Sequence, residues 1–271
     1  MATERFVVCN QLRLGVVRTL GVDLAAQPAK TGVCLIQWDL PRGPAIEHIG
    51  VGADDALVVE LAKSSDRVAI DCPLGWPQAF VAFLVADGSG SGAEHTASAV
   101  ADDIFWRLTD QRIKPLRIPL SVAADRIART AFRCVRLQHA LAAADIPVDR
   151  SGTTGRVIEA YPAASLVRWG LMPAASYKNK DAAGVLATLA ASLVDAVGSI
   201  HLATGTAFAD VISALSASDD HVDGFVCALV ARAHASGRTD GAPCGEDELS
   251  RARAEGWIHL PTADSLRALG G

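Results

Sequence analysis

The first part of the chain alternates apolar runs with turn residues and acids. Residues 54–65 place apolar side chains along one side, which predicts a helix capped by Asp54 or Asp55. The runs around it predict strands, so the expected order is strand, strand, strand, helix, strand. The four expected strands cover residues 18–25, 31–40, 44–52 and 67–77. This order predicts an α/β fold built on a central sheet.

The rest of the chain has a mainly helical pattern. A glycine–serine stretch at residues 87–95 leads into a helical block that extends to about residue 145. We interpret residues 84–150 as a helical insertion in a single domain that spans residues 1–271. The remaining expected elements are strands at 155–166 and 255–262 and alanine-rich helices at 181–199, 207–216 and 219–237.

The composition narrows the class of protein. The formal net charge of −5 excludes a strongly basic nucleic-acid binder, but it permits an enzyme with a local basic patch. No uncharged apolar run approaches the roughly 18 residues of a membrane span, and charges interrupt the N-terminal region where a signal peptide would be apolar. Six scattered cysteines without a CxxC pair favour reduced thiols in a cytoplasmic protein. The oligomeric state stays open, a dimer included.

Acids stand at the ends of several expected strands. Asp23 ends the first strand, Asp71 ends the fourth, and Glu159 lies on the strand that follows the helical block. If these strands are parallel neighbours, their acids meet at one edge of the sheet, where α/β proteins place their ligand sites. Clustered carboxylates require raised pKa values or a bound cation, and hard oxygen ligands favour Mg²⁺ or Mn²⁺.

The helix expected at residues 219–237 opens with three aspartates. Asp219 is the expected N-cap, because aspartate is favoured at that position. Asp220 and Asp223 are three residues apart, so they share a helix face and can approach the strand acids. Two metal ions held about 4 Å apart by such carboxylates suit in-line attack of water on a phosphodiester.

The element order and these acids resemble the ribonuclease H-like fold, with a mixed sheet flanked by helices and a helical insertion. The helix segment "DDHVDGFVCALVA" resembles the D-x-x-D helix of RuvC-type Holliday junction resolvases. In this helix pattern alanine usually stands where the chain has Gly224. More of the chain resembles the predicted RNase H-like nuclease family called domain of unknown function 429 (DUF429). The matching segments are "GVDLAAQPAKTGVCLI", "VAIDCPLGWP", "FWRLTDQRI", "VIEAYPAASL", "SYKNKD", "DDHVDGFVCALVA" and "EGWIHLP".

The resemblance implies roles for individual residues. The implied catalytic acids are Asp23, Asp71, Glu159, Asp220 and Asp223. Four of these, Asp23, Asp71, Asp220 and Asp223, are the implied ligands of Mg²⁺ or Mn²⁺. The implied substrate-binding residues are Arg107, Thr109, Asp110 and Lys178.

A row of arginines suggests a partner. Arg126, Arg129, Arg133 and Arg136 are spaced to share one helix face. Such a face is either a solvated surface or a track for the phosphates of a nucleic acid. Nucleic acid is therefore one possible partner.

The leading hypothesis is a metal-dependent nuclease or phosphodiesterase that hydrolyses a nucleic-acid phosphodiester. An alternative is an ATP-dependent phosphotransferase of the actin and sugar-kinase type, although Ala25 stands where the first phosphate loop of that class has glycine. A third is a non-catalytic binding protein that has kept the fold.

Overall fold

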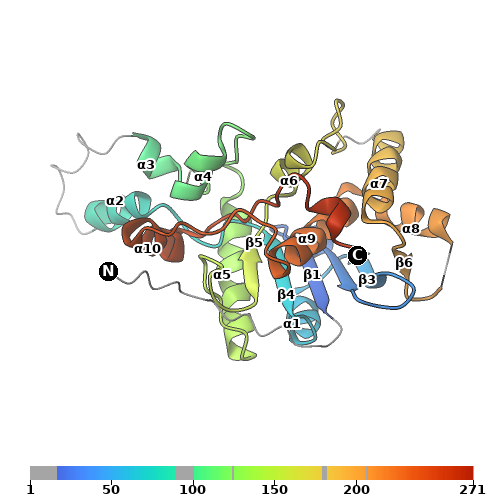
Figure 1. Cartoon of the computed structure of the whole chain (residues 1–271). Helices are drawn as coiled ribbons and strands as arrows, with labels where there is room; N and C mark the ends of the chain where they lie inside the picture. The colour runs from blue at the N-terminus through green and yellow to red at the C-terminus, as the bar shows by residue number, and fades with distance from the viewer. Residues whose placement is uncertain (1–16, 89–100, 124, 179–181, 206, 271) are drawn as a thin grey trace, which may run out of the picture.

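The computed structural model describes residues 17–88, 101–123, 125–178, 182–205 and 207–270 (Figure 1). Most of the glycine–serine stretch expected at residues 87–95 lies outside these ranges. The described strands are β1 (Arg18–Asp23), β2 (Gly32–Gln37), β3 (Ala45–Val51), β4 (Arg67–Asp71), β5 (Val157–Glu159) and β6 (His201–Leu202). The described α-helices are α1 (Asp55–Lys63), α2 (Gln78–Gly88), α3 (Ala101–Phe105), α4 (Leu108–Ile113), α5 (Ala128–Ala143), α6 (Pro162–Arg168), α7 (Ala183–Val197), α8 (Phe208–Leu215), α9 (Asp219–Ala235) and α10 (Glu246–Glu255).

The strands form one mixed sheet in the order β5-β4-β1-β2-β3-β6. β1 pairs in parallel with β4 and antiparallel with β2, while β4 and β5 are parallel. The predicted α/β class and the order of its first five elements are confirmed. β5 is shorter than expected because Pro162 begins α6, and residues 255–262 contribute only isolated bridges to neighbouring segments.

Helices cover both faces of the sheet. Alternate residues of a strand point to opposite faces, so Leu20 and Val22 pack with α1 and α5, while Cys34 and Ile36 pack with α7, α8 and α9. α5 lies within the expected insertion, but Leu137 and its neighbours belong to the main core. α2 and α4 instead contact α10, and α3 contacts α2, away from the sheet (Figure 1). None of the described helices combines the length and hydropathy that a bilayer crossing requires.

Glycines allow α9 to lie directly on β1 and β2. A Cβ at Gly21 would overlap the backbone of α9 at Gly224 and Ala228, and a Cβ at Gly32 would overlap Asp220. Gly224 itself lies so close to β2 that a Cβ there would stand 3.3 Å from the carbonyl carbon of Gly32. This close approach suits a glycine at a position where the D-x-x-D helix pattern has alanine.

The helix N-termini resolve two predictions about caps. Asp54 caps α1 by accepting a hydrogen bond from the backbone N–H of Leu57 at 2.8 Å. The prediction for α9 was wrong, because Ser218 is its N-cap and Asp219 is the first helical residue. The Asp219 carboxylate therefore adds negative charge to the first turn, where it complements the helix dipole.

Candidate metal centre

Two strand ends and one helix bring three acids together. Asp23 and Asp71 end β1 and β4 and are direct partners in the parallel register of these strands. α9 crosses the same strands at glycine contact distance and presents Asp223 to them. One carboxylate oxygen from each of the three aspartates lies within 4.8 Å of the other two. We call Asp23, Asp71 and Asp223 the aspartate triad.

Two neighbours from the segment before α7 contact the triad. The hydroxyl of Tyr177 donates to Oδ1 of Asp223 at 2.9 Å, and Nζ of Lys178 lies 2.5 Å from Oδ2 of the same residue. Asp223 is fully buried, whereas Asp23 and Asp71 are partly exposed. The triad therefore opens towards solvent on the strand side and is held by Tyr177 and Lys178 on the helix side.

The electrostatics of the triad favour a cation. Burial raises the pKa of Asp71 to about 7, with Asp223 and Glu159 adding to the rise and Lys178 opposing it. Burial also raises the pKa of Asp23 well above its usual value, and Asp223 and Asp71 raise it further. Burial lowers the pKa of Lys178, but the carboxylates of Asp223 and Asp71 outweigh burial and the net change is upward. One ammonium group faces three carboxylates, so the donor set fits a divalent ion with hard oxygen ligands.

Asp220 and Glu159 lie outside the triad. Asp220 is half-buried, three residues before Asp223 on α9, and burial raises its pKa. Its role as a metal ligand stays a prediction. Glu159 is 2% exposed, and its Oε2 accepts a hydrogen bond from the backbone N–H of Leu74 at 2.9 Å. Glu159 acts on the triad through its negative charge, which helps to raise the pKa of Asp71.

A buried arginine holds Glu159. Arg107 donates to both carboxylate oxygens of Glu159, at 2.8 and 2.7 Å, and to both oxygens of Asp110, at 2.9 and 2.8 Å. Asp110 is fully buried. The buried hydroxyl of Thr109 accepts a hydrogen bond from the backbone N–H of Ile258. Asp110 therefore supports Glu159 through Arg107, and Thr109 and Asp110 are both buried, not at a surface open to substrate.

The comparison with known protein families covers most of the chain. The family described as "Protein of unknown function (DUF429)" matches residues 21–248. The chain belongs to this family. The DUF429 match includes all three aspartates of the triad as well as Arg107 and Lys178. No curated protein and no solved structure matches the chain.

A cavity adjoins the triad of this DUF429 protein. It has a volume of about 340 Å³, and its wall includes Asp71, Lys178 and the Arg107–Glu159 pair. Two exposed arginines, Arg117 and Arg126, also line it. Lys178 was predicted to contact substrate, and it lies between the triad and this cavity. Arg117 was not predicted, because a single arginine in an irregular segment carries no sequence signal.

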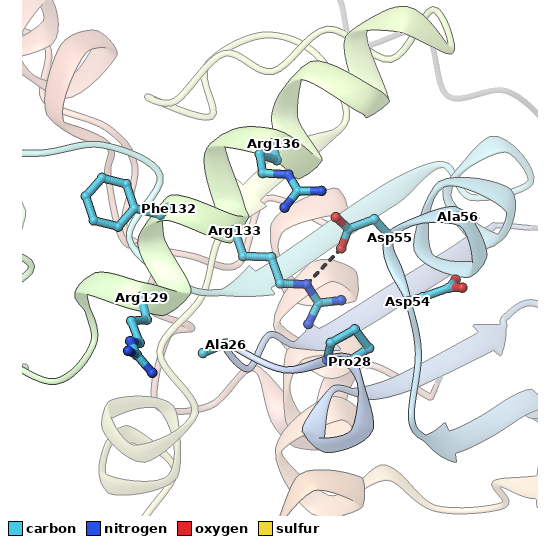
Figure 2. Close-up of a pocket in the computed structure, with 9 residues that line it drawn as sticks. All are labelled: Ala26, Pro28, Asp54, Asp55, Ala56, Arg129, Phe132, Arg133 and Arg136. Carbon is cyan, nitrogen blue, oxygen red and sulfur yellow. Dashed lines mark hydrogen bonds and ion pairs between the residues drawn. The ribbon is translucent and has the colours of Figure 1, made fainter.

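The predicted arginine face is divided in the structure. α5 begins at Ala128, so Arg126 precedes the helix, and Arg133 points into the protein (Figure 2). Nε of Arg133 lies 2.8 Å from Oδ1 of Asp55, and its other nitrogens donate to Thr31 and to the carbonyls of Ala25 and Ala53. Arg133 is 7% exposed and cannot reach a phosphate on the surface. This corrects the expectation of four arginines on one open face, whereas Arg126, Arg129 and Arg136 are exposed.

Proposed function

We propose that this DUF429 protein is a metal-dependent hydrolase of nucleic-acid phosphodiesters. The observation that carries the proposal is the aspartate triad, whose three oxygens lie within 4.8 Å of one another at the carboxyl edge of β1 and β4. Oxygen-only donor sets favour Mg²⁺ and Mn²⁺ over softer metals. Sites at this edge of α/β sheets bind ligands in many proteins, which supports the same assignment.

The topology supports an RNase H-like interpretation of the fold. β2 runs antiparallel to β1 and β3, while β1, β4 and β5 run parallel, and the acids stand on the first and fourth strands and on a late helix. This is the arrangement that the sequence resemblance implied. The proposed chemistry would accordingly take place at the ends of β1 and β4.

The residues around the triad have distinct tasks in the proposed reaction. Asp23, Asp71 and Asp223 would hold the metal, which supplies Lewis-acid stabilisation of charge on the phosphate and lowers the pKa of water. Tyr177 fixes the rotamer of Asp223 through its hydrogen bond. Lys178 carries a positive charge between the triad and the cavity, so its ammonium group is placed to bind a phosphate oxygen.

Cleavage assays on the purified protein test this proposal. We expect Mg²⁺- or Mn²⁺-dependent cleavage of labelled DNA or RNA, and a loss of roughly 100-fold or more in Asp23→Asn, because a weakened ligand set loses several kcal/mol of transition-state stabilisation. The matched control is Asp195→Asn, which changes an exposed aspartate on α7. Full activity in Asp23→Asn would exclude the triad as the site. Tight Mn²⁺ binding without cleavage of any nucleic acid would exclude hydrolase activity.

A further inference from the structure

We infer that the substrate is single-stranded nucleic acid, bound along the exposed edge of α5 with one base stacked on Phe132. This inference rests on the proposed function, because it names the substrate class of the same site. It starts from two cavities near the carboxyl edge of the sheet, the 340 Å³ cavity beside the triad and a second of about 520 Å³.

The two residues before α5 and its first turn connect the two cavities. Arg126 lines the cavity beside the triad, and Arg129, three residues later, lines the second one. The second cavity is also lined by Ala26 and Pro28, which directly follow the strand that ends at Asp23. A chain that left the triad could therefore follow α5 from one cavity to the next.

The exposed arginines along this path differ from the buried ones in their partners. Within the described residues, neither Arg126 nor Arg129 nor Arg136 forms an ion pair, in contrast to Arg107 and Arg133, which carboxylates hold. Arg129 and Arg136 are seven residues apart, so they lie two turns, roughly 10 Å, apart along one side of α5. Unpaired guanidinium groups in a row suit the repeated phosphates of a nucleic-acid backbone.

The acids that line the second cavity are already engaged. Asp55 is paired with Arg133, and the side chain of Asp54 caps α1. Arg133 offsets the charge of Asp55, whereas Asp54 stays exposed to solvent. Arg129 and Arg136 are exposed as well, so two cations and one anion of the cavity lining face solvent, and the balance favours an anion.

An aromatic ring stands beside these arginines. Phe132 is 65% exposed, and its ring lies 5.6 Å from that of Trp76 at a tilt of 43°. Figure 2 shows Phe132 and Arg133 pointing in different directions from α5, and Phe132 lines the same cavity as Arg129 and Arg136. Rings interleaved with cations bind single strands, because an unpaired base offers a free face for stacking and a base in a duplex does not.

Fluorescence anisotropy on the full chain in EDTA tests the inference without cleavage. The probes are a labelled single-stranded DNA, a single-stranded RNA of the same sequence and a blunt DNA duplex. We expect either single strand to bind more tightly than the duplex, and Phe132→Ala to weaken single-strand binding about tenfold. Phe132→Tyr should restore binding, and Arg136→Gln should weaken it with a smaller salt dependence. The matched control is Phe208→Ala, since Phe208 is 55% exposed on α8.

The outcomes separate this inference from the proposed function. Equal binding of duplex and single strands, no binding of either strand, or unchanged binding in Phe132→Ala would overturn the single-strand track. Metal-dependent cleavage by the wild-type protein would then still support the triad as the hydrolytic site. Phe132-dependent binding without any metal-dependent cleavage would support the track and overturn the hydrolase proposal.

Discussion

At the scale of single residues, Lys178 offsets part of the negative charge of the aspartate triad. Its ammonium group lies 2.5 Å from Asp223 and is the cation that faces the triad in the described part of the chain. The Asp223 carboxylate would also serve a metal ion, so the lysine and the metal would compete for its negative charge. On the proposed function, Lys178 should therefore stabilise the metal-free protein and weaken metal binding.

Lys178→Met separates these two effects. We expect Mn²⁺ affinity, measured by calorimetry, to rise about tenfold, because removal of the ammonium group removes a like charge. In EDTA the variant should unfold more easily by about 1–2 kcal/mol, since the buried carboxylates lose their partner. Lys63→Met, which alters an exposed lysine on α1, is the control. Weaker Mn²⁺ binding in Lys178→Met would instead mean that the lysine orders the triad for the metal.

The sequence predicted the triad better than the residues around it. Asp23 and Asp71 could be found because each ends an apolar run, and strand ends are readable from local pattern. The pairing of Arg107 with Glu159 could not be predicted, because it joins residues 52 positions apart and such contacts leave no local sequence pattern. The inward direction of Arg133 depends in the same way on Asp55, which belongs to a different helix. The substrate-binding role of Arg107 stays a prediction.

At the scale of elements, the contact between α9 and β1 sets the geometry of the triad. The helix carries Asp223 and the strand carries Asp23, so the distance between the two backbones fixes the distance between the carboxylates. Gly21 lies where the backbones meet. The sequence predicted the helix and the strand but not their separation, because a glycine in a strand pattern indicates close approach without naming the partner.

Gly21→Ala tests this dependence. The added methyl group would meet backbone atoms of Gly224 and Ala228, which cannot rotate away, so α9 must shift. We expect a loss of about 2–4 kcal/mol in urea unfolding and weaker Mn²⁺ binding. Gly184→Ala on α7 is the control, because a Cβ there meets nothing within 4 Å. It should leave metal binding unchanged and raise stability by up to about 1 kcal/mol. Unchanged Mn²⁺ binding in Gly21→Ala would mean that the geometry of the triad does not depend on the contact between α9 and β1.

At the scale of the whole molecule, buried ionisable groups act on stability in opposite directions. The triad carboxylates have raised pKa values, so their contribution to stability is greatest at low pH and is lost as the pH rises through about 7. Two packed histidines have the reverse effect on stability, which they lower as the pH falls. The rings of His234 and His259 lie 4.5 Å apart, edge to face, and the ring of His259 is 2% exposed. Burial lowers the pKa of His234 to about 3 and that of His259 to about 4, and the positive charge of Arg67 lowers both further.

This histidine pair predicts a sensitivity to acid. A histidine held neutral in the folded state contributes stability above its ordinary pKa, and that stability is lost as the pH falls towards the lowered value. Between about pH 7 and about pH 5, the wild-type protein should lose about 1–2 kcal/mol more unfolding free energy than His259→Gln, measured by urea titration in EDTA. The glutamine keeps an N–H near the carbonyl of Ser151, which lies 3.0 Å from Nε2 of His259, but it takes up no proton. His139→Gln, an exposed position on α5, should follow the wild-type curve. If His259→Gln loses as much stability as the wild type, the buried pair does not cause the acid sensitivity, since the triad carboxylates change stability with the opposite sign.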